Sequence, residues 1–384
     1  MNAWLVIRLL LALLLGSLAL HVVTTFYTLL AWKLTLLATE YGHRLALLAL
    51  FIALAGFWKS GWMTHAGTFL LVASAVLLLI PLVQAHTIAQ TLVSDLHVPF
   101  HDAKRSTEAP PKLFHGLWIP DRPEARKPEV FDYFKVATES RKLYFYRAAN
   151  RTNAPCIIVL HSGGWENGTV DEFCEWSRYW SSRGFAVASV EYRLSPEHHW
   201  PAPRDDVRLA LAWMKEKAAQ LGIDSAFFIL LGRSAGMQIA TTCAYGLNDP
   251  AIRGCVALYG PADLIFARRH TPEHDVLDSV RLMRNYIGAD IDEAETSYCD
   301  ASSLFLATAR SCPTLIAHGR RDTLVWYRQS ERLAARLREL NVTHFHLELP
   351  WATHSFDWPF DGPAAQLTRV SVDVFLDYLM NLER

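Results

Sequence analysis

A buried strand that runs straight into a glycine-flanked serine constrains this chain more than any other feature. The apolar run Phe227–Leu231 leads directly into residues 232–236, Gly-Arg-Ser-Ala-Gly, which have the pattern G-x-S-x-G. A chain that passes from strand to helix within two residues must bend sharply, and glycines at both ends of the turn supply the space for that bend. The pattern predicts a nucleophilic Ser234 at the apex, beside the N–H of Ala235 at the helix start. A plain glycine-flanked turn is the alternative.

The bulk composition narrows the classes of protein. The 384 residues are enough for one large α/β domain with an addition. Because 37 basic and 38 acidic side chains give a formal net charge of −1, no overall field attracts nucleic acid, and nucleic-acid binding is not expected. The six cysteines are widely spaced and form no C-x-x-C pair. This spacing argues against a metal cluster and favours buried thiols in a reducing compartment, although two or three disulfides remain compatible with it.

Hydrophobic residues make up 51% of the chain, and their excess is concentrated before His86. We expect about three transmembrane helices within residues 1–86, at 9–32, 43–59 and 66–85, since about 20 apolar residues cross a bilayer. The middle segment is short and could instead be re-entrant. A cleaved signal peptide is the competing interpretation of the first segment, but its apolar core is too long.

The orientation of these spans rests on few charges. With three spans, Lys33 and Arg44 lie on the same side as the C-terminal domain, whereas Arg8 and Lys59 lie on the opposite side. Cytoplasmic loops carry an excess of Lys and Arg, so the count favours a multi-pass membrane protein with a cytoplasmic C-terminal domain. If the middle segment does not cross, the N-terminus shares the side of that domain.

Residues 87–130 are polar and rich in proline, which predicts a linker or arm. Residues 131–384 then alternate strands with helices, and this alternation predicts a mostly parallel sheet with helices on both faces. The expected strands are 143–147, 156–160, 185–191, 227–231, 255–259, 314–317 and 345–349. The expected helices are 202–220, 235–245, 326–340 and 364–382. Residues 263–306 are long enough to form a cap or lid.

A serine hydroxyl needs a base to accept its proton and a carboxylate to orient that base. Asp322 follows the strand at 314–317, and His354 follows the strand at 345–349. This order of serine, acid and histidine, each after a strand, predicts Ser234, Asp322 and His354 as a catalytic triad. Asp263 is an alternative acid one strand earlier.

Two further groups of residues bear on the site. Gly163 and Gly164 follow the strand at 156–160, where backbone amides without side chains can approach a substrate, so we expect them to complete an oxyanion hole with Ala235. His270 and His274 have helical spacing, but Pro272 lies between them and a third ligand is missing. We therefore expect a solvated pocket rim rather than a metal site.

Residues 130–384 resemble the α/β-hydrolase superfamily, specifically the acetyl-esterase and hormone-sensitive-lipase-like carboxylesterases. The resemblance rests on five ordered motifs: His161-Ser-Gly-Gly-Trp165, Glu191-Tyr-Arg-Leu-Ser-Pro-Glu-His-His-Trp-Pro-Ala-Pro203 with Asp205 and Asp206, the turn at Ser234, His318-Gly-Arg-Arg-Asp322, and His354. It implies the α/β-hydrolase fold, the triad of Ser234, Asp322 and His354, and an oxyanion hole of Gly163, Gly164 and Ala235. It implies no cofactor and no metal.

The sequence departs from the usual pattern of that family at three positions, without removing a catalytic group. Ser162 stands where the first glycine of the oxyanion motif is usual, Arg233 precedes the nucleophile, and Met237 follows the turn. Arg233 is expected to pair with Asp205 or Asp206, or else to favour an acidic substrate.

The sequence as a whole predicts a membrane-anchored serine esterase that hydrolyses a carboxylic ester through an acyl-enzyme, with a small-molecule or lipid ester as substrate. Acyl transfer by the same triad is one alternative. A membrane protein that only binds a ligand is another. The acyl and alcohol groups and the oligomeric state stay open.

Overall fold

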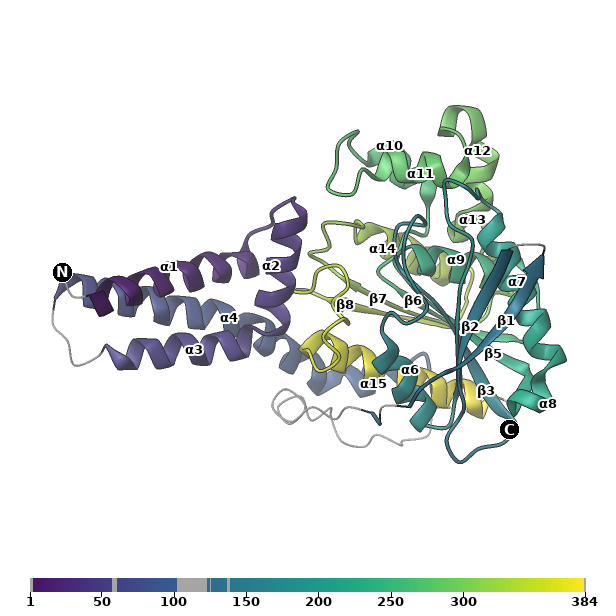
Figure 1. The fold of residues 1–384 in the computed structure, drawn as a ribbon, viewed down its shortest axis with the longest axis horizontal. Helices are drawn as coiled ribbons and strands as arrows, with labels where there is room; N and C mark the ends of the chain where they lie inside the picture. Colours follow the sequence, from purple (N-terminus) through teal and green to yellow (C-terminus); the bar gives the residue numbers. More distant parts are fainter. Residues whose placement is uncertain (1–2, 57–60, 102–122, 125, 137–138, 383–384) are drawn as a thin grey trace.

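In the computed structural model, residues 3–56, 61–101, 123–124, 126–136 and 139–382 are described. A domain built on one sheet, residues 129–382, here called the sheet domain, is joined to helices that extend away from it (Figure 1). These helices, residues 3–84, are called the helical arm.

Eight strands in the described part of the chain form one sheet in the order β1-β2-β4-β3-β5-β6-β7-β8. Their bounds are β1 Glu129–Val136, β2 Glu139–Tyr146, β3 Ala154–Leu160, β4 Ala186–Val190, β5 Ile223–Arg233, β6 Ile252–Leu258, β7 Thr314–Gly319 and β8 His344–Leu349. The strands from β4 to β8 pair in parallel, whereas β1 pairs antiparallel with β2, and β2 with β4. The expected mostly parallel sheet is confirmed. All seven expected strands are present, and β1 is an additional edge strand.

Helices cover both faces of this sheet. Their bounds are α6 Cys174–Ser182, α7 Ala202–Glu216, α8 Ala218–Leu221, α9 Ala235–Gly246, α14 Arg328–Glu339 and α15 Pro363–Asn381. One hydrophobic core combines α6 and α15 with one face of the sheet, and a second core combines α7 and α9 with the other. Every residue of β3 and β4 is buried, because strands covered on both faces have no solvent side.

Between β6 and β7 the chain forms the four helices α10 Leu264–His270, α11 Ser279–Ile287, α12 Ile291–Asp300 and α13 Ser303–Leu306. Figure 1 shows α10, α11 and α12 as a layer above one edge of the sheet domain. The predicted cap segment, residues 263–306, therefore consists of short helices, which we call the cap.

The arm contains α1 Ala3–Val23, α2 Leu29–Glu40, α3 Gly42–Ala55 and the first part of α4 Trp62–Leu96. Figure 1 shows α1, α3 and α4 side by side, with α2 crossing the end of this bundle that meets the sheet domain. Two described helices, α1 and α4, are long and apolar enough to cross a membrane, and the bent pair of α2 and α3 adds a third span if it is counted as one.

The predicted spans differ from these helices. The expected helix 9–32 ends at Val23, and a new helix begins after Thr28, whose side-chain oxygen caps the N–H of Ala31 at 3.1 Å. In place of the middle span 43–59, α3 has 14 residues, about 21 Å at 1.5 Å per residue, and it bends away from α2 by 78°. The expected span 66–85 lies within α4, which continues to Leu96 and contacts α15.

The first ten residues of the expected linker, 87–96, are therefore helical. They are amphipathic, since Ala89, Leu92 and Leu96 join the core with α15, and this periodicity outweighed the general polarity of the segment. Most of the remaining linker, residues 102–122 and 125, lies outside the described residues.

Arg8 lies inside the arm rather than at its surface. Its side chain is 1% exposed, and its nitrogens donate to the carbonyl oxygens of Ile52 at 3.2 Å, Ala53 at 3.2 Å and Thr64 at 3.1 Å. Carbonyl groups at the C-terminal end of α3 lack helical partners, so a cation there satisfies them. In this position Arg8 joins three helices. It is therefore not one of the exposed Lys and Arg residues flanking a span from which membrane orientation is predicted.

Candidate active site

The predicted turn at Ser234 is a sharp strand-to-helix turn between β5 and α9. Ser234 has φ 51° and ψ −121°. Residues other than glycine rarely adopt this backbone conformation, which costs about 1–3 kcal/mol. A Cβ atom on Gly232 would lie 2.1 Å from the Gly236 oxygen, and one on Gly236 would lie 2.3 Å from the Leu160 oxygen. Both glycines are therefore required by close backbone approach.

Ser234, His354 and Asp322 come together at the ends of β5, β8 and β7. His354 Nε2 lies 3.0 Å from Ser234 Oγ, and His354 Nδ1 lies 2.6 Å from Asp322 Oδ2. All three side chains are buried. The structure therefore places the serine, base and acid within hydrogen-bond reach, in the arrangement that activates a serine nucleophile.

The carboxylate of Asp322 is held from several directions. The N–H groups of Leu324 and Val325 donate to Oδ1 at 2.8 and 2.9 Å, and His318 Nε2 lies 3.1 Å from Oδ2. Burial by itself raises the pKa of Asp322, but the adjacent His354 and the hydrogen bonds from His318 and His354 outweigh it and hold this pKa below its usual range. Asp322 therefore stays ionised and can stabilise a protonated His354.

His318 was not assigned a role from the sequence beyond its place in a motif. Its side chain is fully buried, and its Nδ1 lies 2.6 Å from Ser330 Oγ on α14. Because Ser330 occupies one ring nitrogen, the other is directed at Asp322. The spacing of four residues between His318 and Asp322 was the only available signal.

Two of the three residues predicted for the oxyanion hole, Gly164 and Ala235, lie beside Ser234 and line the same cavity. Ala235 is the first residue of α9, so its N–H has no acceptor within the helix. Gly163 and Gly164 have φ 118° and 60°, and a Cβ on Gly163 would lie 2.0 Å from the Asn167 oxygen. The close approach of the chain's own Asn167 oxygen therefore excludes a side chain at Gly163, and the role of Gly163 and Gly164 in an oxyanion hole stays a prediction.

The cavity at Ser234, here called the acyl cavity, has a volume of about 80 Å³. Its walls are mainly apolar and come largely from the cap, including Leu264, Phe266, Leu282 and Met283. The space is therefore small and apolar, and helices of the cap form part of its wall.

The remaining sequence candidates have other roles. The carboxylate of Asp263 accepts hydrogen bonds from Arg332 at 2.7 Å and from the N–H of Phe266 at 2.8 Å, so it caps α10, while the carboxylate beside His354 is that of Asp322. His270 lines the acyl cavity, and its Nδ1 lies 2.9 Å from the Phe266 oxygen. Within the described residues, no group of three His, Cys, Asp or Glu side chains is placed to hold a metal.

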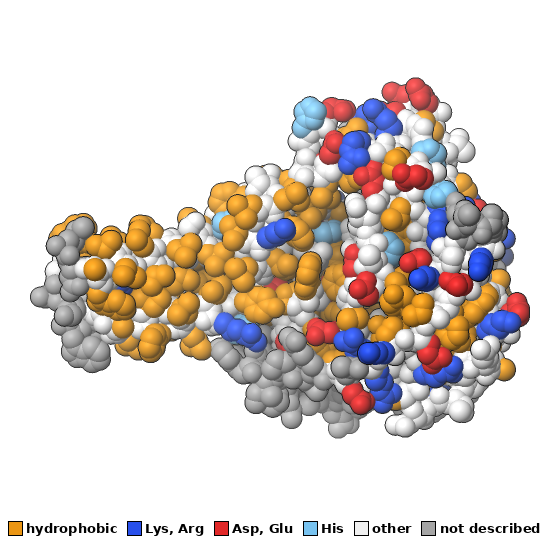
Figure 2. Space-filling view, viewed as in Figure 1, with side chains coloured by type: hydrophobic (Ala, Val, Ile, Leu, Met, Phe, Trp, Pro, Cys, Tyr) orange, Lys and Arg blue, Asp and Glu red, His pale blue; other side chains and the backbone are white. Residues whose placement is uncertain are grey.

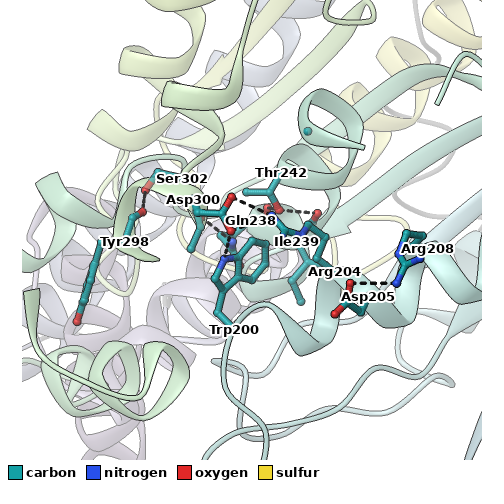
Figure 3. Close-up of polar contacts among 12 residues, drawn as sticks. Trp200, Arg204, Asp205, Arg208, Gln238, Ile239, Thr242, Tyr298, Asp300 and Ser302 are labelled. Carbon is teal, nitrogen blue, oxygen red and sulfur yellow. Dashed lines mark hydrogen bonds and ion pairs between the residues drawn. The ribbon is translucent and has the colours of Figure 1, made fainter. Parts of the chain in front are cut away.

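A buried polar network connects the cap to the helix that carries the nucleophile. Gln238 on α9 accepts hydrogen bonds from Trp165 and Tyr286 and donates to the Ala301 oxygen at 2.7 Å. Figure 3 shows Gln238 near Asp300, whose carboxylate accepts from Trp200 at 2.8 Å and from Arg204. Fully paired networks of this kind hold one arrangement.

The expected pairing of Arg233 with Asp205 or Asp206 is wrong. Arg233 Nε donates to Asp357 at 2.7 Å, with both side chains almost fully buried. Asp206 instead pairs with Arg193, and Asp205 lies against Arg208 on the same helix, as Figure 3 shows for the second pair. Asp357 is only three residues after His354 in the sequence.

The pair also lies against aromatic rings. The Arg233 guanidinium carbon lies 4.3 Å from the centre of the Phe173 ring, and the Tyr259 hydroxyl donates to Asp357 at 2.5 Å. Tyr259 in turn packs edge-on against the His354 ring, at 4.9 Å between ring centres. The Arg233–Asp357 pair therefore connects the turn that carries Ser234 to the loop that carries His354.

The helical arm contacts the loops that carry Asp322 and His354. Trp32 Nε1 on α2 donates to the backbone oxygen of His354 at 2.9 Å. Arg321, next to Asp322, donates to the His21 oxygen at 3.3 Å and to the Thr24 oxygen at 2.6 Å, at the end of α1. No motif in the sequence signals these contacts, because they join residues about 300 positions apart.

Residues 143–337 match a known protein family. A family model described as BD-FAE matches residues 143–337, which is 195 of the 384 residues. The chain belongs to the BD-FAE family. The match begins within β2, so it includes neither the arm nor β1.

Relatives of this BD-FAE chain are named as esterases. Esterase LipC of Mycobacterium tuberculosis is 30% identical over 243 residues, which cover 58% of this chain and 58% of LipC. Carboxylesterase NlhH of the same species is 34% identical over 146 residues, covering 38% of this chain and 43% of NlhH. The matched region thus spans 58% of the length of LipC and less than half of the length of NlhH.

Solved structures share its fold. A thermophilic esterase from Thermogutta terrifontis has a TM-score of 0.54 and 19% identity, covering 68% of this chain and 94% of that protein. An acetyl ester-xyloside bifunctional hydrolase from Caldicellulosiruptor lactoaceticus has a TM-score of 0.52 and 20% identity, covering 62% and 91%. The expected resemblance to the α/β-hydrolase carboxylesterases is confirmed.

Proposed function

We propose that this BD-FAE chain is a membrane-anchored serine esterase that hydrolyses a carboxylic ester through an acyl-enzyme. The observation that carries the proposal is the continuous hydrogen-bonded chain from Ser234 Oγ through His354 to Asp322, which opens onto an apolar cavity. The names of the relatives support the same class of reaction.

The reaction follows from this geometry. Ser234 Oγ attacks the carbonyl carbon of the ester while His354 Nε2 accepts the hydroxyl proton. The N–H groups of Ala235, Gly163 and Gly164 stabilise the tetrahedral oxyanion, and the ionised Asp322 stabilises the protonated His354. His354 then gives its proton to the leaving alkoxide, and the acyl group stays on Ser234. Water, deprotonated by His354, hydrolyses this acyl-enzyme and restores the serine.

The surface of the arm supports anchoring in a bilayer. Figure 2 shows hydrophobic side chains over most of its visible surface, whereas charged groups gather on the sheet domain. Large apolar side chains such as Leu14, Phe51 and Phe69 are 65%, 70% and 76% exposed. Exposing such a surface to water is unfavourable in free energy, whereas exposing it to the hydrocarbon core of a bilayer is not. In this arrangement α2 lies at the level where the arm meets the sheet domain (Figure 1).

The first experiment is labelling of the full chain with a fluorophosphonate, which reacts covalently with activated serines. We expect labelling of the unsubstituted chain and its loss in Ser234→Ala. Ser182→Ala, which changes an exposed hydroxyl on α6 that donates to the Tyr179 oxygen, is the matched control and should label normally. Absence of Ser234-dependent labelling in folded protein would exclude the esterase proposal.

Anchoring has its own test. After expression, membranes are washed with alkaline carbonate, which removes peripheral proteins. The full chain should stay in the membrane pellet. Its appearance in the supernatant would contradict anchoring while leaving the esterase proposal intact.

A further inference from the structure

A second cavity lies where the helical arm meets the sheet domain. Its volume is about 430 Å³, and it is here called the arm cavity. Four aromatic side chains form most of its apolar wall: Trp32 from α2, Phe173 and Trp176 at the start of α6, and Trp358 from the loop after His354. Aromatic walls of this kind favour hydrocarbon chains.

The arm cavity is adjacent to the candidate active site. Ser355, the residue after His354, lines it, and so does Ser162, the residue before Gly163. Trp32 touches both places, because its ring lines the cavity while its N–H donates to the His354 oxygen. The arm cavity is therefore lined by the immediate neighbours of His354 and Gly163, and its lining residues differ from those of the acyl cavity.

Exposed apolar side chains also occur at the start of α2 and at the arm cavity itself. Tyr27 and Leu30, at the start of α2, are 72% and 67% exposed, and Trp358 at the cavity is 67% exposed. Exposed large apolar groups grouped at the end of a membrane-spanning bundle indicate contact with lipid.

The two cavities differ in size. The acyl cavity has about 80 Å³ and the arm cavity about 430 Å³. An ester that places a short acyl group in the first has its long hydrophobic part on the alcohol side. Glu172, Glu175 and Arg178 also line the arm cavity, so polar groups near the ester can be accommodated there as well.

We propose that the arm cavity binds the hydrocarbon chain on the alcohol side of a membrane-resident ester that has a short acyl group. This inference rests on the proposed esterase function for the chemistry. The binding itself does not, since the cavity is formed by residues other than Ser234, His354 and Asp322.

Binding is therefore tested without catalysis. Cys174 lines the arm cavity, whereas Cys299 in the cap does not, and both are partly exposed free thiols. The full chain carrying Ser234→Ala is placed in phosphatidylcholine nanodiscs and treated with a maleimide, with dodecyl ethyl ether or diethyl ether as the non-hydrolysable probe. We expect the dodecyl ether to slow labelling of Cys174 by about fivefold or more at saturating probe. Labelling of Cys299 should not change, and diethyl ether should protect neither thiol.

Two variants complete the test. Trp358→Ala removes one wall through a mostly exposed side chain and should abolish the protection. Trp62→Ala, which removes a ring that is 76% exposed at the start of α4, is the matched control and should keep it. Equal labelling of Cys174 with and without the dodecyl ether, or protection that survives Trp358→Ala, overturns the proposal. Because Ser234 is absent, these results are independent of the fluorophosphonate result, which alone decides the proposed function.

Discussion

The buried pair of Arg233 and Asp357 gives the sharpest prediction about stability. Their side chains are 1% and 0% exposed, with Arg233 Nε 2.7 Å from Asp357 Oδ2. Removing one partner of such a pair leaves an uncompensated charge in the interior, which costs about 3–5 kcal/mol. We therefore expect Asp357→Asn, which keeps the shape and an acceptor for Tyr259, to lower the free energy of unfolding by this amount.

Two other features of Arg233 change the expected loss of stability when Arg233 itself is replaced. The guanidinium also lies over the Phe173 ring at 4.3 Å, so Arg233→Met loses a desolvated cation–π contact of about 2 kcal/mol as well as the ion pair. In the other direction, Arg233 Nη2 is buried without a hydrogen-bond partner among the described residues. An unsatisfied donor of this kind costs about 1–3 kcal/mol, so removing Arg233 recovers part of the loss.

The measurement is a double-mutant cycle. Thermal unfolding of the full chain in detergent is compared for Asp357→Asn, Arg233→Met and the double variant. A loss of 3–5 kcal/mol corresponds to a fall in Tm of roughly 6–20 °C for a domain of this size. Because the double variant carries neither charge, its loss should be smaller than the sum of the single losses by about 2 kcal/mol or more.

An exposed ion pair is the control. Arg269 and Glu295 are 59% and 60% exposed at 3.0 Å, so Glu295→Gln should cost less than about 1 kcal/mol. The reasoning is refuted if Asp357→Asn destabilises no more than Glu295→Gln, or if the two single losses are simply additive.

Three further predictions concern the site and the arm. His318→Ala removes a hydrogen bond that lowers the pKa of Asp322, so this pKa should rise. Esterase activity, measured as kcat/KM, should therefore fall more at about pH 5 than at about pH 8. An equal loss at both pH values would contradict the role of His318 in holding Asp322 ionised. Gly236→Ala places a Cβ 2.3 Å from a backbone oxygen, so the yield of folded protein by size-exclusion chromatography should fall sharply, whereas normal yield would contradict the close approach. Arg8→Leu leaves three carbonyl oxygens unsatisfied, so proteolysis within the arm should accelerate; unchanged proteolysis would count against that role.

The lowered pKa of Asp322 also makes the stability of the fold depend on pH. The pKa of Asp322 is lower in the folded chain than in the unfolded chain, so its ionised form stabilises the fold above the unfolded pKa. That contribution is lost as the pH falls through the depressed folded value. His318→Ala therefore reduces it at neutral pH and brings its loss to a higher pH.

Much of the sheet domain could be predicted because local patterns report it directly. Largely apolar runs of four to seven residues between turns predict buried strands, and all seven such runs form strands. β1 was missed because Asp132, Lys135 and other polar residues interrupt an edge strand that has one exposed face. α6 was missed because its two buried tryptophans carry the periodicity in only nine residues.

The arm was predicted less well for a physical reason. Hydropathy averages over a window, so it finds segments apolar enough for a bilayer but does not see where a helix bends. The break after Val23 depends on the cap at Thr28 and on the contact of Trp32 with the His354 loop. The contact of Trp32 with the His354 loop joins residues more than 300 positions apart in the chain.

By itself, the sequence determined the alternation of strands and helices, the sharp turn at Ser234 and the order of serine, acid and histidine. Each of these depends on local patterns, because every member of the predicted triad follows its own strand. Tertiary structure alone decided that Arg233 pairs with Asp357, that His318 holds Asp322, and that α2 lies against the loop of His354. A charged side chain selects its partner by burial and distance in space. Neither quantity can be read along the chain, which is why the turn at Ser234 was predictable and its surroundings were not.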